Sequence, residues 1–488
     1  MRQPGRMRTE AHVECFADKM KKKILVILGA GSSSALGLPS VKCLDFLMGQ
    51  WGSKWAASRA NADHFRELWQ SVKTYYRRGG SALHPELNFE TVLGEMIAMA
   101  HWMEPPPDGD TLRQAACDNA APPRMDFRCQ ESESDAMEEL AGDPDDSLEG
   151  ECDAAGESGG EGVSLPTESK GKRGAHIELM DGYSFLLERL AQHMRAESQR
   201  LNSANTPEKD KYRKLLGGLR ERFDVGVYNL NYDTAALDAL PGAYAGFSET
   251  GAFEPRVVHE RKDWDFVYHL HGSVHHSLHC RYVGNKIVWR PSLDGEFFDG
   301  PEGRWSDLRS NGIKIPRTTL VAGGFKLDQL LFEPFQSFHA SLVRHVYAAD
   351  AILIGGYGFG DAHINFALRN RLSLTQDRLR VQDRPPVMVL GLADDRRVTM
   401  RYREDLWAKE LGQVLCTGRG GHFFLDPSRP SNPIPGELPK NVFEVDPQLH
   451  VAIWQGGFIE AEPRISAIAQ WLDGTADDVL ASERSRTT

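Results

Sequence analysis

The chain has 488 residues, of which 41% are hydrophobic, and its formal net charge is -12. This length and apolar content are enough for one large domain or for two or three ordinary ones. The acidic balance argues against non-specific phosphate binding by the whole chain, and therefore against direct nucleic-acid binding, although it leaves room for a local basic patch. No apolar stretch approaches the ~20 residues that a membrane-spanning helix needs, so we expect no membrane span.

The seven cysteines are scattered along the chain and form no C-x-x-C pair. This spacing argues against a structural zinc site and against a disulfide framework, and it fits the reducing cytosol, so we expect a cytoplasmic protein. A basic run at Lys21–Lys23 precedes an apolar run, as it would in a signal peptide. The apolar run is too short and lacks a cleavage-site pattern, which argues against that interpretation.

Residues 1–20 are mostly polar and are expected to form an N-terminal extension. The next feature is an unbroken apolar run at Ile24–Leu28, which predicts a strand buried on both faces of a parallel sheet.

A glycine-rich turn follows this strand, with Gly29, Gly31 and Gly37. A strand that runs into a glycine turn and then into a helix can cradle a diphosphate, because glycine lets the backbone approach the ligand and the N–H groups at the helix start face the anion. The serines at 32–34 offer hydroxyls and predict a helix N-cap near Ser33. The spacing differs from G-x-G-x-x-G, which disfavours an ordinary dinucleotide dehydrogenase, and a plain strand-turn-helix is the alternative.

Two insertions follow. Apolar residues recur at helical spacing over about 41–101, which predicts a helical insertion with one amphipathic helix at Leu87–Ala100. From about 104 to 176 the sequence is rich in Glu, Asp, Ser and Gly and poor in large apolar residues, which predicts a disordered acidic surface insertion. A role for this tract as a nucleic-acid mimic or a partner gate is the less favoured alternative.

The rest of the chain alternates predicted helices and strands. Helices are predicted at about 177–199, 208–222 and 333–348, and strands from Asp224 onward and at 266–270, 319–322, 351–354, 387–392 and 413–417. Segments at 278–283 and 286–289 read as a hairpin turned by Gly284-Asn285. The alternation predicts an α/β fold, a Rossmann-like doubly wound parallel sheet, over residues 21–425. The Pro-rich segment 426–488, with one helix near 464–472, is expected to be a C-terminal extension.

Glycine-rich or polar clusters follow four of these strands. They lie at residues 29–34, 231–233, 271–273 and 355–361. Because ligands bind at the carboxyl ends of the strands in doubly wound sheets, the clusters predict a single shared site.

The ordered set of motifs resembles the sirtuin-like family. It comprises Gly-Ala-Gly-Ser and Gly-Leu-Pro at 29–39, Asn-Tyr-Asp at 231–233, Leu-His-Gly-Ser at 270–273 and Gly-Gly-Tyr-Gly-Phe-Gly-Asp-Ala-His-Ile-Asn at 355–365. The resemblance covers about 21–100 and 177–395 and is greatest to the branch found in bacterial antiviral defence. Asn88-Phe89-Glu90 also resembles the helix that follows the first loop in that branch. It implies a Rossmann-like sheet that cleaves the nicotinamide–ribose bond of NAD.

The resemblance also implies roles for individual residues. The pyrophosphate of NAD would be held by Gly29, Ala30, Gly31 and Ser32. Asn231 would position water or the nicotinamide ribose, Asp233 would lie beside that ribose, and His271 would be the catalytic histidine. The ribose would be lined at the later strand end by Gly355, Tyr357 and Gly358, and the same motif includes Asp361 and Asn365.

The chemistry of these residue types agrees. Loss of nicotinamide leaves an oxocarbenium-like ribose, so the site needs orientation and groups that stabilise developing positive charge. A histidine can take a proton from a ribose hydroxyl or from water, and an asparagine amide can hold that water. The structural alternatives are a buried asparagine that satisfies backbone groups, a structural histidine before glycine, and helix N-caps at Asp233 and Asp361.

A second histidine cluster, with His275, His276, His279 and Cys280, raises the alternative of a zinc site. Its spacing lies on a predicted strand and no second ligand pair follows, so we expect no metal. Protein-deacylating sirtuins carry a zinc-bound module with two C-x-x-C pairs in this part of the fold, whereas this chain has a His-rich hairpin. The departure disfavours lysine deacylation.

The favoured hypothesis is therefore an NAD hydrolase that converts free NAD to ADP-ribose and nicotinamide and depletes NAD during phage infection, as in abortive infection. The resemblance implies a homo-oligomer, with a partner ATPase or helicase, nuclease or Argonaute encoded nearby. The alternatives are an NAD-dependent protein-lysine deacylase and a non-enzymatic sensor that binds NAD or ADP-ribose without turnover.

Overall fold

The structure is a computed structural model. It describes residues 21–58, 89–103, 175–279, 286–299, 305–310, 313–323, 326–373, 384–391, 411–415, 443–446, 449–454 and 456–475, together with residues 65, 67, 68, 70 and 480. The predictions for residues 1–20 and for the acidic tract up to residue 174 lie outside the described residues.

A seven-stranded sheet forms the centre of the fold, in the order β10-β11-β9-β8-β1-β2-β3. Its strands are β1 (Lys22–Leu28), β2 (Phe223–Asn229), β3 (Asp265–His269), β8 (Ala351–Gly355), β9 (Val387–Leu390), β10 (Phe443–Asp446) and β11 (Val451–Trp454). All neighbours pair in parallel except the edge strand β10, which runs antiparallel to β11. The predicted Rossmann-like α/β class is confirmed.

The order of the strands places a topological switch point between β1 and β8. The strands β2 and β3 follow β1 on one side of the sheet, and β8, β9 and β11 lie on the other. In doubly wound sheets the crevice for ligands opens where the order reverses, beyond the carboxyl ends of the strands. Here that position is occupied by the turn after β1 and the turn after β8.

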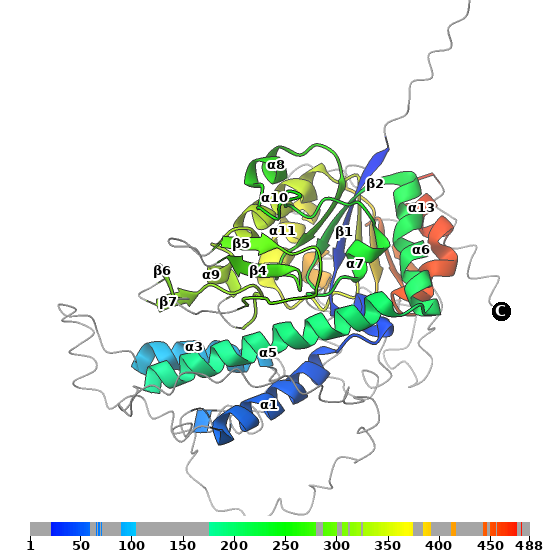
Figure 1. Cartoon of the computed structure of the whole chain (residues 1–488). Helices are drawn as coiled ribbons and strands as arrows, with labels where there is room; N and C mark the ends of the chain where they lie inside the picture. Colours follow the sequence, from blue (N-terminus) through cyan, green and yellow to red (C-terminus); the bar gives the residue numbers. More distant parts are fainter. Residues whose placement is uncertain are drawn as a thin grey trace, which may run out of the picture.

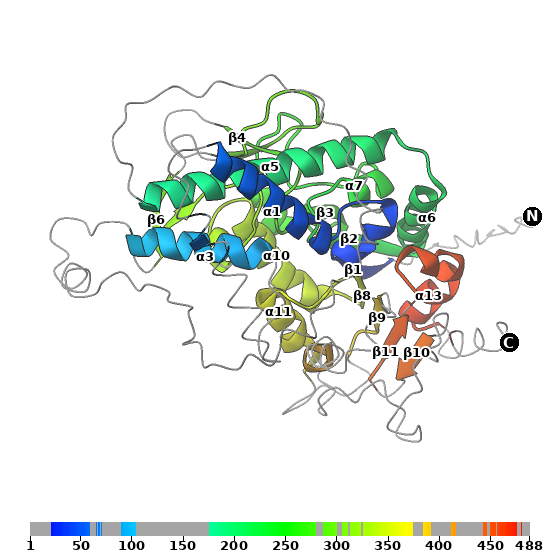
Figure 2. The same cartoon turned by 90° about the horizontal axis from the view of Figure 1, so that it is seen from below.

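Helices cover both faces of the sheet (Figures 1 and 2). On one face, α6 (Pro207–Arg222), η6 (Ile459–Arg464) and α13 (Ile465–Leu472) pack on Ile24, Val26 and Leu28 of β1. On the other, α8 (Pro255–Glu260), α10 (Phe335–Ala348) and α11 (Ala362–Leu372) pack on Leu25 and Ile27. Successive side chains of a strand point to opposite faces, so an unbroken apolar run serves both layers.

Three helices form a separate layer, which Figure 1 shows below the sheet. They are α1 (Val41–Ala57), α3 (Phe89–Met103) and α5 (Ala175–Ser203). Their apolar faces share a core with Tyr232, Val274 and Leu320, which follow the carboxyl ends of β2 and β3 or lie beside them. The predicted helices of the 41–101 insertion and the helix at 177–199 thus cover the end of the sheet that carries the site.

The prediction of a helix opening near Ser33 is wrong. The chain instead makes two short 3-10 turns, η1 (Ala30–Ser32) and η2 (Ser34–Leu36), and Gly37 ends the second with a φ of 76°. Pro39 follows, and the residue before a proline avoids helical backbone, so α1 begins only at Val41, capped by Ser40.

The prediction of a parallel strand at 319–322 is also wrong. This segment is extended but touches the backbone of the turn after β3 through one antiparallel bridge, between Leu320 and Gly272, and β8 pairs directly with β1. Leu320 and Ala322 are buried in the core of the helical layer, and Val321 is buried in the core between the sheet and α10, although none of the three pairs with a strand of the sheet.

A strand predicted at 413–417 is wrong as well, since residues 411–414 are helical. Leu411, Val414 and Leu415 are buried at the i, i+3, i+4 spacing of one helix face. The sheet is extended instead by β11 and β10, which belong to the 426–488 segment, and α13 of the same segment packs in the sheet core. These three elements join that segment to the Rossmann-like sheet.

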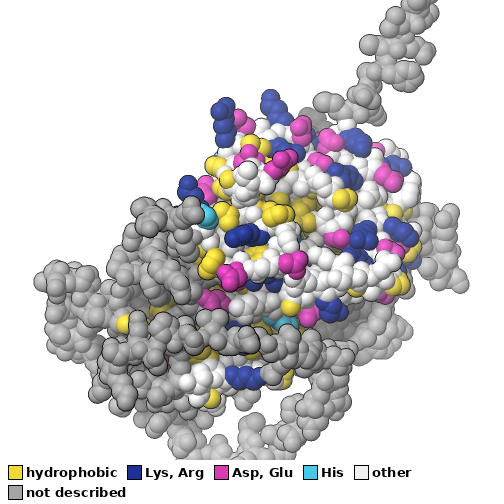
Figure 3. Space-filling view, in the orientation of Figure 1, with side chains coloured by type: hydrophobic (Ala, Val, Ile, Leu, Met, Phe, Trp, Pro, Cys, Tyr) yellow, Lys and Arg dark blue, Asp and Glu magenta, His cyan; other side chains and the backbone are white. Residues whose placement is uncertain are grey.

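The remaining elements lie around the sheet. They are α7 (Ala235–Ala239), α9 (Lys326–Gln329) and two antiparallel hairpins, β4 (His276–His279) with β5 (Lys286–Trp289) and β6 (Trp305–Ser310) with β7 (Ile313–Pro316). The first hairpin was predicted, and its Gly284-Asn285 turn lies outside the described residues. Within the described part of the chain, no helix is long and apolar enough to cross a membrane. Figure 3 shows acidic and basic side chains interspersed over the described part of one face.

Candidate active site

The two turns at the switch point are in direct backbone contact. Gly29 N–H donates to Gly355 O and Gly31 N–H donates to Gly356 O, both at 2.9 Å. A Cβ at Gly29 would lie 2.7 Å from Tyr357 Cα, and one at Gly31 would lie 3.0 Å from Gly356 Cα. Glycine is therefore required here because the two turns approach each other closely. The motif alone had predicted that the glycines make room for a ligand.

The N–H groups of the glycine turn are mostly used inside the protein. Ser32 N–H donates to Gly29 O at 2.9 Å and Ser33 N–H to Ala30 O at 3.3 Å, in addition to the two bonds to the β8 turn. Ala30 and Gly31 are exposed. The predicted pyrophosphate contacts from Gly29–Ser32 would therefore require these internal bonds to be exchanged for bonds to the anion.

Asn231 joins the end of β2 to the glycine turn. Its side-chain amide lies 3.0 Å from Gly29 O and 3.2 Å from the hydroxyls of both Ser32 and Ser33, and all three oxygens can accept from it. Its own N–H donates to Asn229 Oδ1 at 3.1 Å. These contacts agree with the structural alternative, in which a buried asparagine satisfies the polar groups of the turn.

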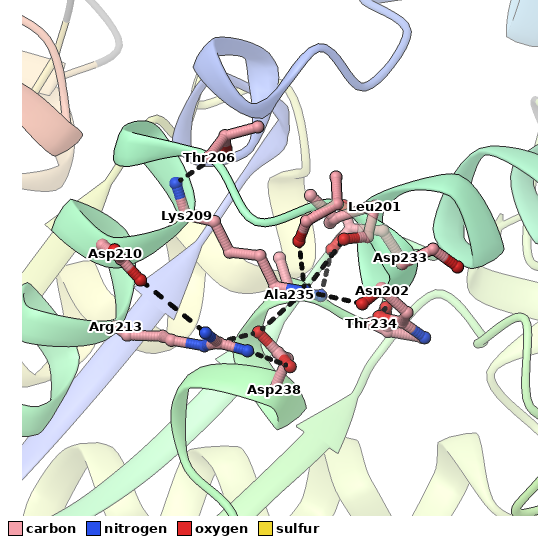
Figure 4. A network of polar contacts seen from close by, with 12 residues as sticks. Leu201, Asn202, Thr206, Lys209, Asp210, Arg213, Asp233, Thr234, Ala235 and Asp238 are labelled. Carbon is pink, nitrogen blue, oxygen red and sulfur yellow. Dashed lines mark hydrogen bonds and ion pairs between the residues drawn. The ribbon is translucent and has the colours of Figure 1, made fainter.

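Asp233 contacts Ser33 of the glycine turn and belongs to the network drawn in Figure 4. Its Oδ1 accepts from Ala235 N–H at 2.9 Å, which fixes the first turn of α7. Burial raises the pKa of this carboxyl, and hydrogen bonds from Ala235 and Ser33 oppose the rise. Beside it, Thr234 donates to Asn202 Oδ1 at 2.9 Å, so this corner is anchored to the end of α5.

His271 and Asp361 come together across the site from the turns after β3 and β8. The His271 Nε2 lies 3.8 Å from Asp361 Oδ1. His271 is 4% exposed, and its Nε2 has no hydrogen-bond partner among the described residues. The pKa of His271 is lowered to about 3, chiefly by burial; the Asp361 carboxylate opposes this shift and the positive charge of Lys326 adds to it. The imidazole is therefore neutral at pH 7.

Two charged residues that the sequence analysis did not place in the site complete this cluster. Lys326 Nζ, at the start of α9, lies 3.0 Å from Asp361 Oδ1 and 2.9 Å from Glu90 Oε1 of α3. Burial would raise the pKa of Asp361, but His271 and Lys326 lower it on balance, so the carboxylate is ionised. The resemblance of Asn88-Phe89-Glu90 was the one signal for Glu90, and nothing in the sequence pointed to Lys326.

Two further histidines extend from His271 along α11 and α10. The ring of His363 lies 5.8 Å from that of His271, and the ring of His339 lies 5.3 Å from that of His363. Burial lowers the pKa of His363 to about 4. His363 lies inside the motif quoted from 355–365 and was not singled out.

The remaining predicted residues shape the β8 turn. Tyr357 Oη donates to Asn365 Oδ1 at 3.0 Å and accepts from Asp361 N–H at 3.2 Å. Asn365 Nδ2 donates to the carbonyl of Phe359 at 2.7 Å, and Phe359 has a φ of 57°. Gly358 faces open space, since a Cβ built there meets nothing within 4 Å. Tyr357 and Asn365 thus hold the strained turn that presents Asp361, and Gly358 is the position open to a ligand.

In the described part of the chain, no group of three or more His, Cys, Asp and Glu residues is placed to hold a metal ion, and Cys280 of the His-rich hairpin lies outside that part. His275 stacks on Trp289 with ring centroids 4.4 Å apart, and its Nδ1 lies 2.7 Å from Arg290 O. Both contacts lie within the hairpin, so His275 has a structural role there.

One comparison with known proteins found a match. Residues 225–412 match the family model described as a SIR2-like domain. Over this segment the chain is similar to SIR2-like domains. The matched segment includes Asn231, His271 and Asp361, and it begins after the glycine turn. Among curated proteins, none matches the chain significantly.

SIR2-like domains are NAD-using enzymes, so the match links this chain to NAD. The arrangement at the switch point fits a bound dinucleotide in two respects. The buried Nε2 of His271 lacks a hydrogen-bond partner among the described residues, and the β8 turn is open at Gly358. In a third respect the arrangement does not fit, because the N–H groups of the glycine turn would have to give up their internal hydrogen bonds to bind the pyrophosphate.

Proposed function

We propose that the protein is an NAD hydrolase, an NAD+ glycohydrolase. Water would replace nicotinamide at the ribose carbon, giving ADP-ribose, nicotinamide and a proton. The observation that supports this proposal best is the pairing of a buried, unprotonated His271 with the Asp361 carboxylate at the switch point, within a SIR2-like domain.

His271 is the residue of the site suited to accept a proton. Its buried imidazole is neutral at pH 7, and the ionised Asp361 carboxylate at 3.8 Å is positioned to compensate the charge that appears when the ring takes up a proton. The same negative charge would favour a developing positive charge on a ribose placed nearby.

Asn231 contributes by fixing the turn that begins the site. Its amide N–H groups are spent on Gly29, Ser32 and Ser33, which leaves its Oδ1 as the atom available to a water or a ribose hydroxyl. In this proposal Asn231 acts through the geometry of the turn as well as through any contact with the substrate.

The sequence supports hydrolysis of free NAD over lysine deacylation, since its seven cysteines include no C-x-x-C pair of the kind that the deacylating zinc module uses. We further propose that the activity serves antiviral defence by depleting NAD during phage infection. In this proposal the protein works in the cytoplasm as a homo-oligomer, with a partner ATPase or helicase, nuclease or Argonaute. This part of the proposal rests on the resemblance to the defence branch.

A second candidate is an NAD- or ADP-ribose-binding sensor without turnover. It is favoured by one observation, the internal hydrogen bonding of the glycine-turn N–H groups, which describes a turn not arranged for catalysis.

Product analysis separates these functions. Purified protein is incubated with NAD, with and without an acyl-lysine peptide, and nicotinamide and ADP-ribose are quantified. Equal amounts of both products without peptide support hydrolysis, whereas nicotinamide released only with the peptide would establish deacylation instead. Saturable NAD binding with neither product, in the oligomer and with candidate partners added, would favour the sensor.

A further inference from the structure

The charged cluster beside His271 extends out of the Rossmann-like sheet into the helical layer. Glu90 lies in the first turn of α3, Lys326 begins α9, and Asp361 precedes α11. The Lys326 ammonium lies between the two carboxylates, 2.9 Å from Glu90 and 3.0 Å from Asp361, and its side chain is 18% exposed. Charge-assisted contacts of this length at a largely buried position are strong and directional.

Lys326 and His271 both lie close to Oδ1 of Asp361. Asp361 Oδ1 accepts from Lys326 Nζ at 3.0 Å and lies 3.8 Å from His271 Nε2. The lysine therefore decides where this oxygen lies relative to the imidazole. We propose that Lys326 is a positioning residue of the site, anchored by Glu90, which holds the Asp361 carboxylate at its working distance from His271 and so makes α3 part of the catalytic arrangement. This inference rests on the proposed NAD cleavage.

The net charge of the cluster shows how Lys326 affects His271 and Asp361. With Glu90 and Asp361 ionised and Lys326 protonated, the cluster carries one net negative charge beside a neutral His271. Removing the lysine charge leaves two carboxylates without a cation, which favours proton uptake by His271 and lets Asp361 move toward the ring. Consistent with this, the charge of Lys326 lowers the pKa of His271, after the larger effects of burial and of Asp361.

Other titratable groups also face this cluster. His363 of α11 lies beside His271, His339 of α10 lies beside His363, and Tyr232 after β2 is buried near both Glu90 and Asp361. Burial holds both histidines at lowered pKa and Tyr232 at a raised pKa, so all three are neutral at pH 7. Lys326 is thus the cation of the cluster at neutral pH.

The kinetic test compares Lys326→Met, Lys326→Arg and Glu90→Gln with the full-length wild type. We expect Lys326→Met to lower kcat for NAD by about 10- to 100-fold, because misplacing a catalytic pair by about 1 Å costs up to about 10²-fold. KM should change less than about threefold, Lys326→Arg should restore most of kcat, and Glu90→Gln should have no further effect in the Lys326→Met background. Lys211→Met is the matched control, since Lys211 of α6 is a partly exposed lysine that pairs with Glu460 of η6 at 3.0 Å and contacts none of the cluster residues.

A second readout does not depend on activity. Histidine titration is followed by NMR from pH 8 to pH 5, with the His271 signal assigned from its absence in His271→Asn. We expect the wild type and Glu90→Gln to show no His271 titration in this range, and Lys326→Met to bring its midpoint up into it. If Lys326→Met does not fold, Lys326→Gln takes its place.

Three results would overturn the inference. They are an unchanged His271 titration in every folded Lys326 variant, a loss that appears in KM alone, which would make Lys326 a substrate contact, and a kcat in Lys326→Met equal to that of Lys211→Met. A wild type without NAD cleavage at any pH would refute the proposed function, and the NMR titration would still decide whether Lys326 controls His271.

Discussion

The side-chain amide of Asn231 lies 3.0 Å from the carbonyl of Gly29 and donates a hydrogen bond to it across 202 positions of sequence. Through this contact Asn231, after β2, holds the turn that follows β1. That turn is hydrogen-bonded to the backbone at the end of β8. Three strand ends are therefore coupled at the switch point, and a change in any one of them should be felt in the others.

Replacing Asn231 tests this coupling. Asn231→Ala removes the donor to Gly29, Ser32 and Ser33 and leaves buried acceptors without it, so we expect a loss of roughly 1–3 kcal/mol in the free energy of unfolding. NAD cleavage should fall together with stability. Denaturant titration and nicotinamide release measure the two effects, and Ser34→Ala, at an exposed position of the same turn, is the control. Full NAD cleavage in Asn231→Ala would show that Asn231 is not part of the catalytic site.

The contact between the two turns predicts different effects at neighbouring glycines. Gly356 has a φ of 59°, and a Cβ there would lie 2.0 Å from Ser32 N, so Gly356→Ala should destabilise the fold by roughly 1–3 kcal/mol or more. Gly358→Ala meets nothing within 4 Å, and we expect its stability to stay within about 0.5 kcal/mol of the wild type. Since Gly358 is the open position of the turn, its variant should raise KM for NAD. Equal stability of the two variants would contradict the close packing of the turns.

Much of this fold follows from local sequence patterns. The apolar run at Ile24–Leu28 predicted the central strand, and the polar residues after three further strands, at Asn231, His271 and Gly355–Asp361, predicted where the site lies. Parallel strands buried on both faces have few alternatives, so β1, β3, β8 and β9 were recovered within one or two residues at each end.

The errors have a common physical cause. The segment 319–322 and residues 411–415 are short and apolar, and such runs do not reveal whether a sheet, a helix or a covering layer buries them. The strand β11 was missed because it lies beyond a Pro-rich stretch, and β10 with it. The partners of Lys326 could not be predicted, since Glu90 and Asp361 are brought to it by packing of α3 and α11 and not by any spacing in the chain.

A buried lysine at the α5–α6 corner gives a stability prediction outside the site (Figure 4). Lys209 Nζ donates to the carbonyls of Leu201, Asn202 and Ala204 at 2.8, 3.1 and 3.3 Å, which are orphan acceptors at the end of α5. Lys209→Met removes the lysine donor from all three acceptors, of which Leu201 O keeps a hydrogen bond from Ala204 N–H, so we expect a loss of about 2–4 kcal/mol in the free energy of unfolding. Lys211→Met removes only an exposed ion pair and should cost about 0–1 kcal/mol. Similar losses in the two variants would contradict the capping role of Lys209.

The buried histidines predict that acid destabilises the fold. Burial lowers the pKa of several of them, to about 4 for His269 and His363 and to about 3 for His271 and His345, whereas the unfolded value is near 6.5. Between these values the unfolded chain binds more protons than the folded one, so stability should rise with pH from about 4 to about 6.5 and level off above it. Burial raises the pKa of Glu90 and Asp233 and acts in the opposite direction, but the histidines are more numerous.

Denaturant titrations at pH 5, 6, 7 and 8 check this prediction. His345→Gln, which removes one buried imidazole far from the site, should flatten the rise between pH 5 and pH 7. A stability that is constant over this range, or higher at pH 5, would contradict it.

The most direct test of the whole account is nicotinamide release from NAD by the wild type and by His271→Asn, measured with NAD binding to both proteins. General acid–base catalysis contributes about 10²- to 10⁴-fold, so we expect His271→Asn to lose at least about 100-fold in rate while it still binds NAD. A His271→Asn protein that cleaves NAD at the wild-type rate would contradict the central claim that His271, beside Asp361 at the switch point, is the catalytic residue of an NAD hydrolase.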